Sequence, residues 1–194
     1  NKLYAINLKS LLGTTIDEGL AFVMICLYLL FEYVRPQSIY TKIDILPWVP
    51  IIIAITVIVA IIRGEFKHKP SHSLNKLMVA YAVIVLFSSI FSTYLHVSLS
   101  KWRVFFDWFI IYFLIVSIVT NEKRFYIFFL SFLLYSFKMS QHGFLSWMKR
   151  GFSYANWGVV GAPGWFHNSG EVGIQMCIFI PLSIAFMIGV YKYL

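Results

Sequence analysis

The sequence predicts an all-α protein that crosses a lipid bilayer several times. Hydrophobic residues make up 60% of the 194 positions and charged residues only 12%, whereas soluble domains are about half apolar and about a quarter charged. The apolar residues form long runs between short polar stretches, as membrane-spanning helices require. Backbone groups in lipid must bond internally, so only helices or a closed barrel can cross it. Runs such as Ile51–Ile62 lack the alternation of barrel strands, so we expect helices.

Six segments of the chain fit such helices. They cover about Gly19–Val34, Leu46–Ile62, Leu74–Tyr94, Val104–Thr120, a segment from Phe125, and a segment from after Gly170 to about Tyr191. Pro47-Trp48 opens the second, and Pro181 predicts a kink in the last. The fifth is apolar only to Phe137, which is too short to span at about 1.5 Å per residue, so we expect it to continue past Lys138. Alternatively, the fourth and fifth form a tight helical hairpin.

The distribution of lysine and arginine favours a cytoplasmic N-terminus. With that orientation the inner segments carry nine of these cations and the outer segments seven, and the inner stretch Arg63–Lys76 is short and basic. The formal charge of +8 fits cytoplasmic cations and sites for anionic lipid or phosphate better than nucleic acid. The chain lacks an initial Met and stops in an apolar segment at Leu194. We therefore expect residues 1–194 to be one transmembrane domain, the N-terminal half of a longer protein.

The glycine- and tryptophan-rich stretch Lys138–Glu171 interrupts the apolar pattern before the last helix. We expect an ordered outer-face loop, since loops of this length are commonly functional and the aromatic content argues against disorder. Where the fifth helix continues, Lys138, Gln141 and His142 share a face. They form either a phosphate site or a snorkelling lysine beside an interfacial histidine.

Further along this stretch, other residues suit an anion. Lys149 and Arg150 pair a point charge with a forked donor, which suits phosphate, or they contact anionic headgroups. Asn168 and Glu171 match a variant of the capping box for the last helix. His167 precedes that cap, near the positive helix end, where it is either a base or phosphate donor or an ordinary loop residue.

Charged residues in or near the spans need partners. The spacing predicts that Glu32 pairs with Arg35 at i, i+3 and that Arg103 pairs with Asp107 at i, i+4. The sequence has no Cys/His metal cluster, no GxxxxGK phosphate loop and no CxxCH haem motif. We therefore expect neither a metal nor a cofactor.

Three motifs carry a resemblance to a known family. Phe31-Glu-Tyr-Val-Arg-Pro-Gln37, after the first span, resembles the bacterial O-antigen ligase and polymerase superfamily, and more closely the O-antigen-ligase-like proteins of exopolysaccharide and exosortase-associated gene neighbourhoods. Lys138-Met-Ser-Gln-His-Gly-Phe144 fits the same group. Gly164-Trp-Phe-His-Asn-Ser-Gly-Glu171 is similar to the Gly-x-Phe-x-Asn segment that leads into a membrane helix in many members. The resemblance covers essentially the whole chain.

The resemblance implies a polytopic, GT-C-like enzyme of the bacterial inner membrane. Such proteins move a glycan from an undecaprenyl-pyrophosphate carrier to an acceptor at the periplasmic face, without metal or nucleotide. Arginines near the membrane surface hold the pyrophosphate, and a histidine in a large periplasmic loop acts as base. The resulting substrate-binding candidates are Arg35, Arg103, Lys138, His142, Lys149, Arg150, His167, Asn168 and Glu171. The family's histidine motif ends in a glycine where this chain has Ile178, so we assign no catalytic base.

Two other functions remain open. A non-catalytic integral membrane subunit would pack its helices against other membrane proteins, and a transporter would need paired broken helices or buried coupling carboxylates, which do not stand out. An enzyme predicts a continuous outer-face cavity lined by Arg103, Lys138, His142 and Arg150. A subunit predicts that these residues are scattered.

Overall fold

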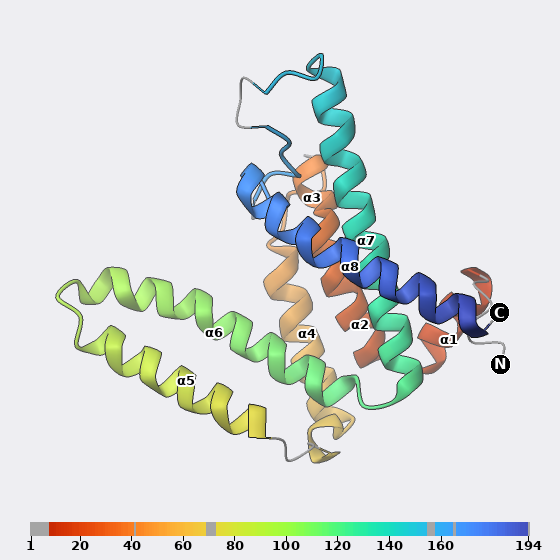
Figure 1. The fold of residues 1–194 in the computed structure, drawn as a ribbon. Helices are drawn as coiled ribbons and strands as arrows, with labels where there is room; N and C mark the ends of the chain where they lie inside the picture. Colours follow the sequence, from red (N-terminus) through yellow and green to blue (C-terminus); the bar gives the residue numbers. More distant parts are fainter. Residues whose placement is uncertain (1–7, 41, 69–72, 155–157, 165, 194) are drawn as a thin grey trace.

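A computed structural model describes residues 8–40, 42–68, 73–154, 158–164 and 166–193, and within these ranges the chain forms helices and no strand (Figure 1). The elements are α1 (Leu8–Asp17), α2 (Leu20–Leu29), a π-helical turn η1 (Leu30–Val34), α3 (Pro36–Ile39), α4 (Trp48–Ile62), a 3₁₀ turn η2 (Glu65–His68), α5 (Ser73–Ile90), α6 (Leu95–Ile118), α7 (Glu122–Lys149) and α8 (Ser169–Tyr193). The predicted all-α class is confirmed.

Three helical stretches in the described residues are long and apolar enough to cross a membrane. They are Leu20–Ile39, Ser73–Ile90 and Ser169–Lys192, while Trp48–Ile62 is equally apolar in character but shorter. α7 is longer than any of these and α6 equals the longest of them at 24 residues, but charged residues interrupt the apolar runs of both. The helices thus suit a lipid bilayer, and each of the six segments predicted from the sequence contains a helix.

Several predicted boundaries are confirmed and others are wrong. α4 begins at Trp48 directly after Pro47, and α7 continues past Lys138 to Lys149, as expected. The outer loop is shorter than predicted, because the first part of Lys138–Glu171 is helical and the loop starts at Arg150. α6 starts already at Leu95, so Arg103 lies in a helix and not in a connection.

The tight hairpin forms between α5 and α6, not between α6 and α7 as the alternative suggested. The Ser98 hydroxyl donates to Ser92 Oγ (2.7 Å) across the turn, and the Tyr112 hydroxyl donates to Asn75 Oδ1 (2.9 Å) between the two helices. The hairpin extends away from the other helices, and α5 is almost entirely exposed along its length (Figure 1).

α2 lies at the centre of the remaining helices and supplies more of the hydrophobic core than any other helix. Its Phe22 and Ile25 are at most 1% exposed, and they pack with Leu114 and Ile118 from the end of α6. α4 and the first half of α7 complete this cluster. Burying such large side chains is worth about 1.5–3 kcal/mol each relative to exposure. Half of the molecule is therefore anchored around α2, whereas α5 and α8 present apolar faces outward.

α2 ends in a local irregularity that repositions Arg35. The last turn widens to a π-helix, with the Arg35 N–H donating to the Leu30 carbonyl oxygen (3.2 Å), and Arg35 itself is left-handed, with φ 52°. The i, i+3 rule assumes a regular helix, so it fails here: the predicted Glu32–Arg35 ion pair is not formed. The predicted Arg103–Asp107 pair is also absent from the described ion pairs, and both side chains are exposed on α6.

An ion-pair network centred on Arg124 holds one end of the molecule. Its guanidinium donates to the carboxylates of Glu18 (2.9 Å) and Glu65 (3.1 Å) and to the carbonyl oxygens of Ile118 (2.8 Å) and Glu18 (2.9 Å). Lys123 adds a more exposed ion pair to Glu18 at 3.1 Å. The network joins the α1–α2, α4–η2 and α6–α7 connections, all of which the sequence predicts on the same side.

We expect acid to weaken this network through Glu18. Burial opposes ionisation of this carboxyl group, but hydrogen bonds from Lys123, Arg124 and Asn121 outweigh that effect and lower the pKa of Glu18 below its ordinary value of 4.5. A carboxyl group with a lower pKa in the folded state stabilises the fold above its unfolded pKa, and the contribution is lost as the pH falls through the folded pKa. The melting temperature in detergent should therefore fall more between pH ~7 and pH ~3.5 in the wild type than in Glu18→Gln.

The neighbouring Asp17 provides the control for this measurement. It is exposed and takes part in none of the described ion pairs, so Asp17→Asn should keep the pH dependence of the wild type. An equal fall in the wild type and in Glu18→Gln would show that Glu18 does not link stability to pH.

Candidate functional site

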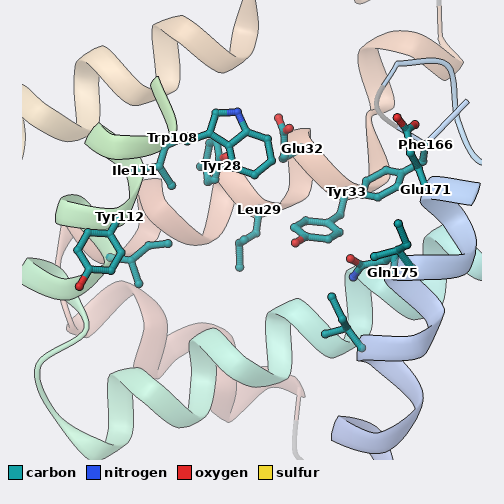
Figure 2. Close-up of a pocket in the computed structure, with 13 residues that line it drawn as sticks. Tyr28, Leu29, Glu32, Tyr33, Trp108, Ile111, Tyr112, Phe166, Glu171 and Gln175 are labelled. Carbon is teal, nitrogen blue, oxygen red and sulfur yellow. The ribbon is translucent and has the colours of Figure 1, made fainter. Parts of the chain in front are cut away.

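A cavity of about 640 Å³ lies between α2 with η1, α6 and the start of α8 (Figure 2). This volume is within the range of small-molecule sites, which are typically apolar with a few placed polar groups. The lining aromatic residues are Tyr28, Tyr33, Trp108, Tyr112 and Phe166. The lining aliphatic residues are Leu29, Ile111, Ile115, Ile174 and Ile178. Three polar residues complete the wall, namely Glu32, Glu171 and Gln175.

The carboxyl groups of the cavity come from two separate elements. Glu32 belongs to η1, and Glu171 belongs to the first turn of α8. In the view of Figure 2 both lie along the upper edge of the cavity, on either side of the Tyr33 and Phe166 rings. Those two rings are themselves in contact, with centroids 5.7 Å apart, so the loop before α8 is attached to η1 at this edge.

Gln175 is the best-fixed polar side chain of the wall. It is 7% exposed, and its Nε2 donates to the hydroxyl of Ser136 on α7 (3.1 Å). Ser136 is fully buried, which keeps this bond out of competition with solvent. Figure 2 shows the amide directed from α8 toward the cavity. The bond to Ser136 thus joins α8 to α7 and leaves the amide oxygen as the acceptor available to a ligand.

Arg35 lies beside this cavity, directly after η1. Its guanidinium approaches Gly164 so closely that a side chain on that residue would collide with it, and Gly164 has φ 120°, which only glycine adopts readily. The guanidinium makes one hydrogen bond within the described part of the chain, from Nε to Ser38 Oγ at 3.4 Å. Its terminal nitrogens are therefore available to an anion at the edge of the cavity.

The predicted helix cap before α8 is confirmed in its first half. The Asn168 side-chain oxygen accepts from the Gly170 N–H (2.9 Å), and its carbonyl accepts from the Val172 N–H (3.2 Å). Glu171 does not bond back to Asn168 among the described contacts and faces the cavity edge instead. His167, just before the cap, is exposed. Capping explains Asn168, whereas Glu171 is free to act in the site.

The other predicted residues lie along α7 and its end. The Lys138 ammonium donates to Gln141 Oε1 (2.9 Å), so these two residues share a helix face as expected. His142 is half-buried with its Nδ1 enclosed and unbonded among the described residues. Lys149 is exposed, and Arg150 donates to the Gly158 carbonyl oxygen (2.8 Å). Arg150 therefore fastens the outer loop to the end of α7.

An enzyme was expected to gather Arg103, Lys138, His142 and Arg150 in one outer-face cavity. This cavity contains none of the four, and of all the predicted site residues it contains only Glu171. Residues that had not been predicted, such as Tyr28, Trp108 and Gln175, form its wall. Each lies inside an apolar run, and aromatic residues such as Tyr28 and Trp108 are ordinary in such runs. Gln175 was the one residue whose type could have indicated the cavity, because a polar side chain buried within a membrane-type helix is costly.

Comparison with known proteins identifies no relative. No protein-family model, no curated protein and no solved structure matches the chain. The cavity and the residues at its edge are therefore the basis for a function.

Proposed function

We propose that this chain is the donor-binding part of a membrane glycan transferase, of the O-antigen ligase or polymerase kind, that acts on undecaprenyl-pyrophosphate-linked sugars. The observation that carries the proposal is the combination of five aromatic residues, two carboxyl groups and one amide in a single cavity, with Arg35 two residues after Tyr33 of its wall. The resemblance of Phe31–Gln37 to this superfamily points the same way.

The chemistry of the cavity suits a sugar. Aromatic rings offer flat apolar faces against which the C–H groups of a sugar ring can pack, and Tyr33 from η1 and Trp108 from α6 supply such faces in the wall. Sugar hydroxyls are donors that carboxylate and amide oxygens accept. Glu32, Glu171 and Gln175 supply such oxygens. A pyrophosphate attached to that sugar would then reach Arg35, whose forked guanidinium matches phosphate oxygens.

We further propose the membrane arrangement predicted from the sequence, with six crossings, a GT-C-like fold and a cytoplasmic N-terminus in the bacterial inner membrane. The different character of the two ends of the molecule supports this arrangement. The Arg124 network occupies one end of α2 and α7, and Arg35 and the loop after Arg150 occupy the other end (Figure 1). The site would then face the periplasm.

Blocking the cavity tests this function. Ile174 lines the cavity from α8, so we expect Ile174→Trp to fill it and to weaken donor binding at least tenfold. The measurement is the affinity of the purified chain in nanodiscs for an undecaprenyl-pyrophosphate-linked disaccharide. Ile180→Trp is the matched control, because Ile180 is on the same helix and similarly exposed (53%, against 66% for Ile174) but lies outside the cavity wall, and it should bind like the wild type. Unchanged binding by Ile174→Trp would refute the proposal.

A non-catalytic membrane subunit is the second candidate. The apolar faces of α5 and α8 favour it, since only 6% and 11% of their spans are buried within the described structure. So does the absence of Arg103, Lys138, His142 and Arg150 from the wall of the cavity. This function predicts no donor binding by the wild type and a stable complex with other membrane proteins through α5 or α8. Donor binding that Ile174→Trp abolishes would decide for the transferase.

A further inference from the structure

The described charged side chains that line the cavity are all acidic. Its two ionisable acids, Glu32 and Glu171, both line the wall, and no lysine, arginine or histidine does so among the described residues. Arg35, which follows Tyr33 of the wall by two residues, has its guanidinium against Gly164. An anionic group inside the cavity would therefore meet like charges, and no cation, on the described wall.

The fixed amide of Gln175 adds to this preference. Its Nε2 already donates to Ser136, and the surrounding side chains leave the residue 7% exposed. Figure 2 shows the amide directed toward the cavity, where its oxygen is an acceptor for a ligand. A buried acceptor favours a hydroxyl or an amine and is left without a partner when a carboxylate takes that place.

We infer that the sugar unit held in this cavity carries no negative charge, being either a neutral sugar or an amino sugar, and that uronic acids and phosphorylated sugars are excluded. The inference rests on the proposed glycan-binding function and specifies its substrate class. Like charges brought together at an interface cost several kcal/mol, so the two glutamates act as a selectivity filter. The same distribution of charge orients the donor, with its sugar in the cavity and its pyrophosphate at Arg35.

Two alkyl glycosides that differ only at C6, where one carries a hydroxymethyl group and the other a carboxylate, test this inference. The chain in nanodiscs is titrated with n-dodecyl β-D-glucoside and with n-dodecyl β-D-glucuronide, and binding is followed by tryptophan fluorescence, to which Trp108 of the wall contributes. Ile174→Trp provides the background from partitioning into lipid. The glucoside should bind at least tenfold more tightly than the glucuronide.

Variants assign the selectivity to its residues. Glu32→Gln combined with Glu171→Gln should bring the two affinities to within about threefold, whereas Asp17→Asn, the same kind of change at the other end of the molecule, should leave the tenfold preference unchanged. Gln175→Met keeps the volume of the side chain but removes the acceptor, and it should weaken glucoside binding about fivefold. Circular dichroism confirms that each variant is folded.

The outcomes separate the inference from the function on which it rests. Equal or tighter binding of the glucuronide, above the background, would overturn the charge selectivity while leaving the cavity a glycan site. Selectivity that survives in the double glutamine variant would also overturn it. Binding of neither glycoside would remove both the inference and the proposed function.

Discussion

Arg124→Met is expected to destabilise the protein by about 3 kcal/mol, because it removes the described cation of the largely buried Glu65 carboxylate and leaves the Glu18 carboxylate with the more exposed Lys123 alone. The side chains of Arg124, Glu18 and Glu65 are 13%, 15% and 18% exposed. Removing the guanidinium also leaves the carbonyl oxygens of Ile118 and Glu18 without a donor. The Cζ atom of Arg124 also lies 5.9 Å from the centre of the Phe22 ring, so the network contacts the hydrophobic core. Urea or thermal unfolding in detergent measures the loss.

Lys123 offers a matched control for this change. It pairs with the same Glu18 carboxylate at 3.1 Å, but its side chain is 39% exposed. Water screens such a pair, so Lys123→Gln should cost less than about 1 kcal/mol. A similar loss of unfolding free energy in both variants would mean that stability depends on the positive charge at this end and not on the geometry of Arg124.

A compensating variant separates unpaired charge from lost packing. If the main cost of Arg124→Met is the repulsion and desolvation of two carboxylates, then adding Glu18→Gln and Glu65→Gln should recover about half of it. Additive losses in the triple variant would contradict this explanation. They would instead assign the effect to the bonds between Arg124 and the backbone.

The network itself shows what sequence patterns miss. Glu18, Glu65 and Arg124 lie in three different connections, and nothing local to any of them indicates a partner. Helix positions followed from apolar runs because a bilayer-type helix needs a long uninterrupted apolar stretch. The boundaries failed where polar residues continue a helix, as at Lys101 and Arg103, since a helix that leaves its apolar stretch gives no sequence signal of ending there.

The site could be predicted only in part for a related reason. Arg35 and Glu171 were among the predicted substrate-binding residues; the structure places Glu171 in the cavity wall, and Arg35 follows Tyr33 of that wall by two residues. Their relation to Tyr28 and Trp108 depends on how η1, α6 and α8 come together, which no spacing within one helix reports. The π-turn was equally hidden, and it changed the partner of Arg35 from Glu32 to the loop at Gly164.

Arg35→Asn should weaken binding of undecaprenyl pyrophosphate by about 100-fold, provided that Arg35 holds the pyrophosphate as proposed. Hydrogen bonds between charged groups contribute about 1.5–3 kcal/mol, and the forked guanidinium can make more than one of them. Asparagine is the suitable replacement because it tolerates the left-handed backbone of residue 35, with φ 52°, better than other non-glycine residues. The variant therefore removes the charge without adding backbone strain.

Lysine at the same position refines the test. Arg35→Lys keeps the positive charge but loses the planar fork, so we expect binding about tenfold weaker than in the wild type. Lys42→Asn removes an exposed cation from the connection between α3 and α4, and it should bind like the wild type. Affinities are measured in nanodiscs with undecaprenyl pyrophosphate and with undecaprenol, which lacks the anionic group.

The comparison of the two lipids decides what Arg35 does. If Arg35 contacts the pyrophosphate, its replacement lowers the affinity for undecaprenyl pyrophosphate and leaves the affinity for undecaprenol unchanged. If Arg35 only holds the loop at Gly164 against η1, both affinities fall together, because the Tyr33–Phe166 edge of the cavity loosens for any ligand. A general basic surface would instead make Arg35→Asn and Lys42→Asn equivalent. Only the first pattern makes Arg35 the counter-charge that the acidic cavity itself lacks.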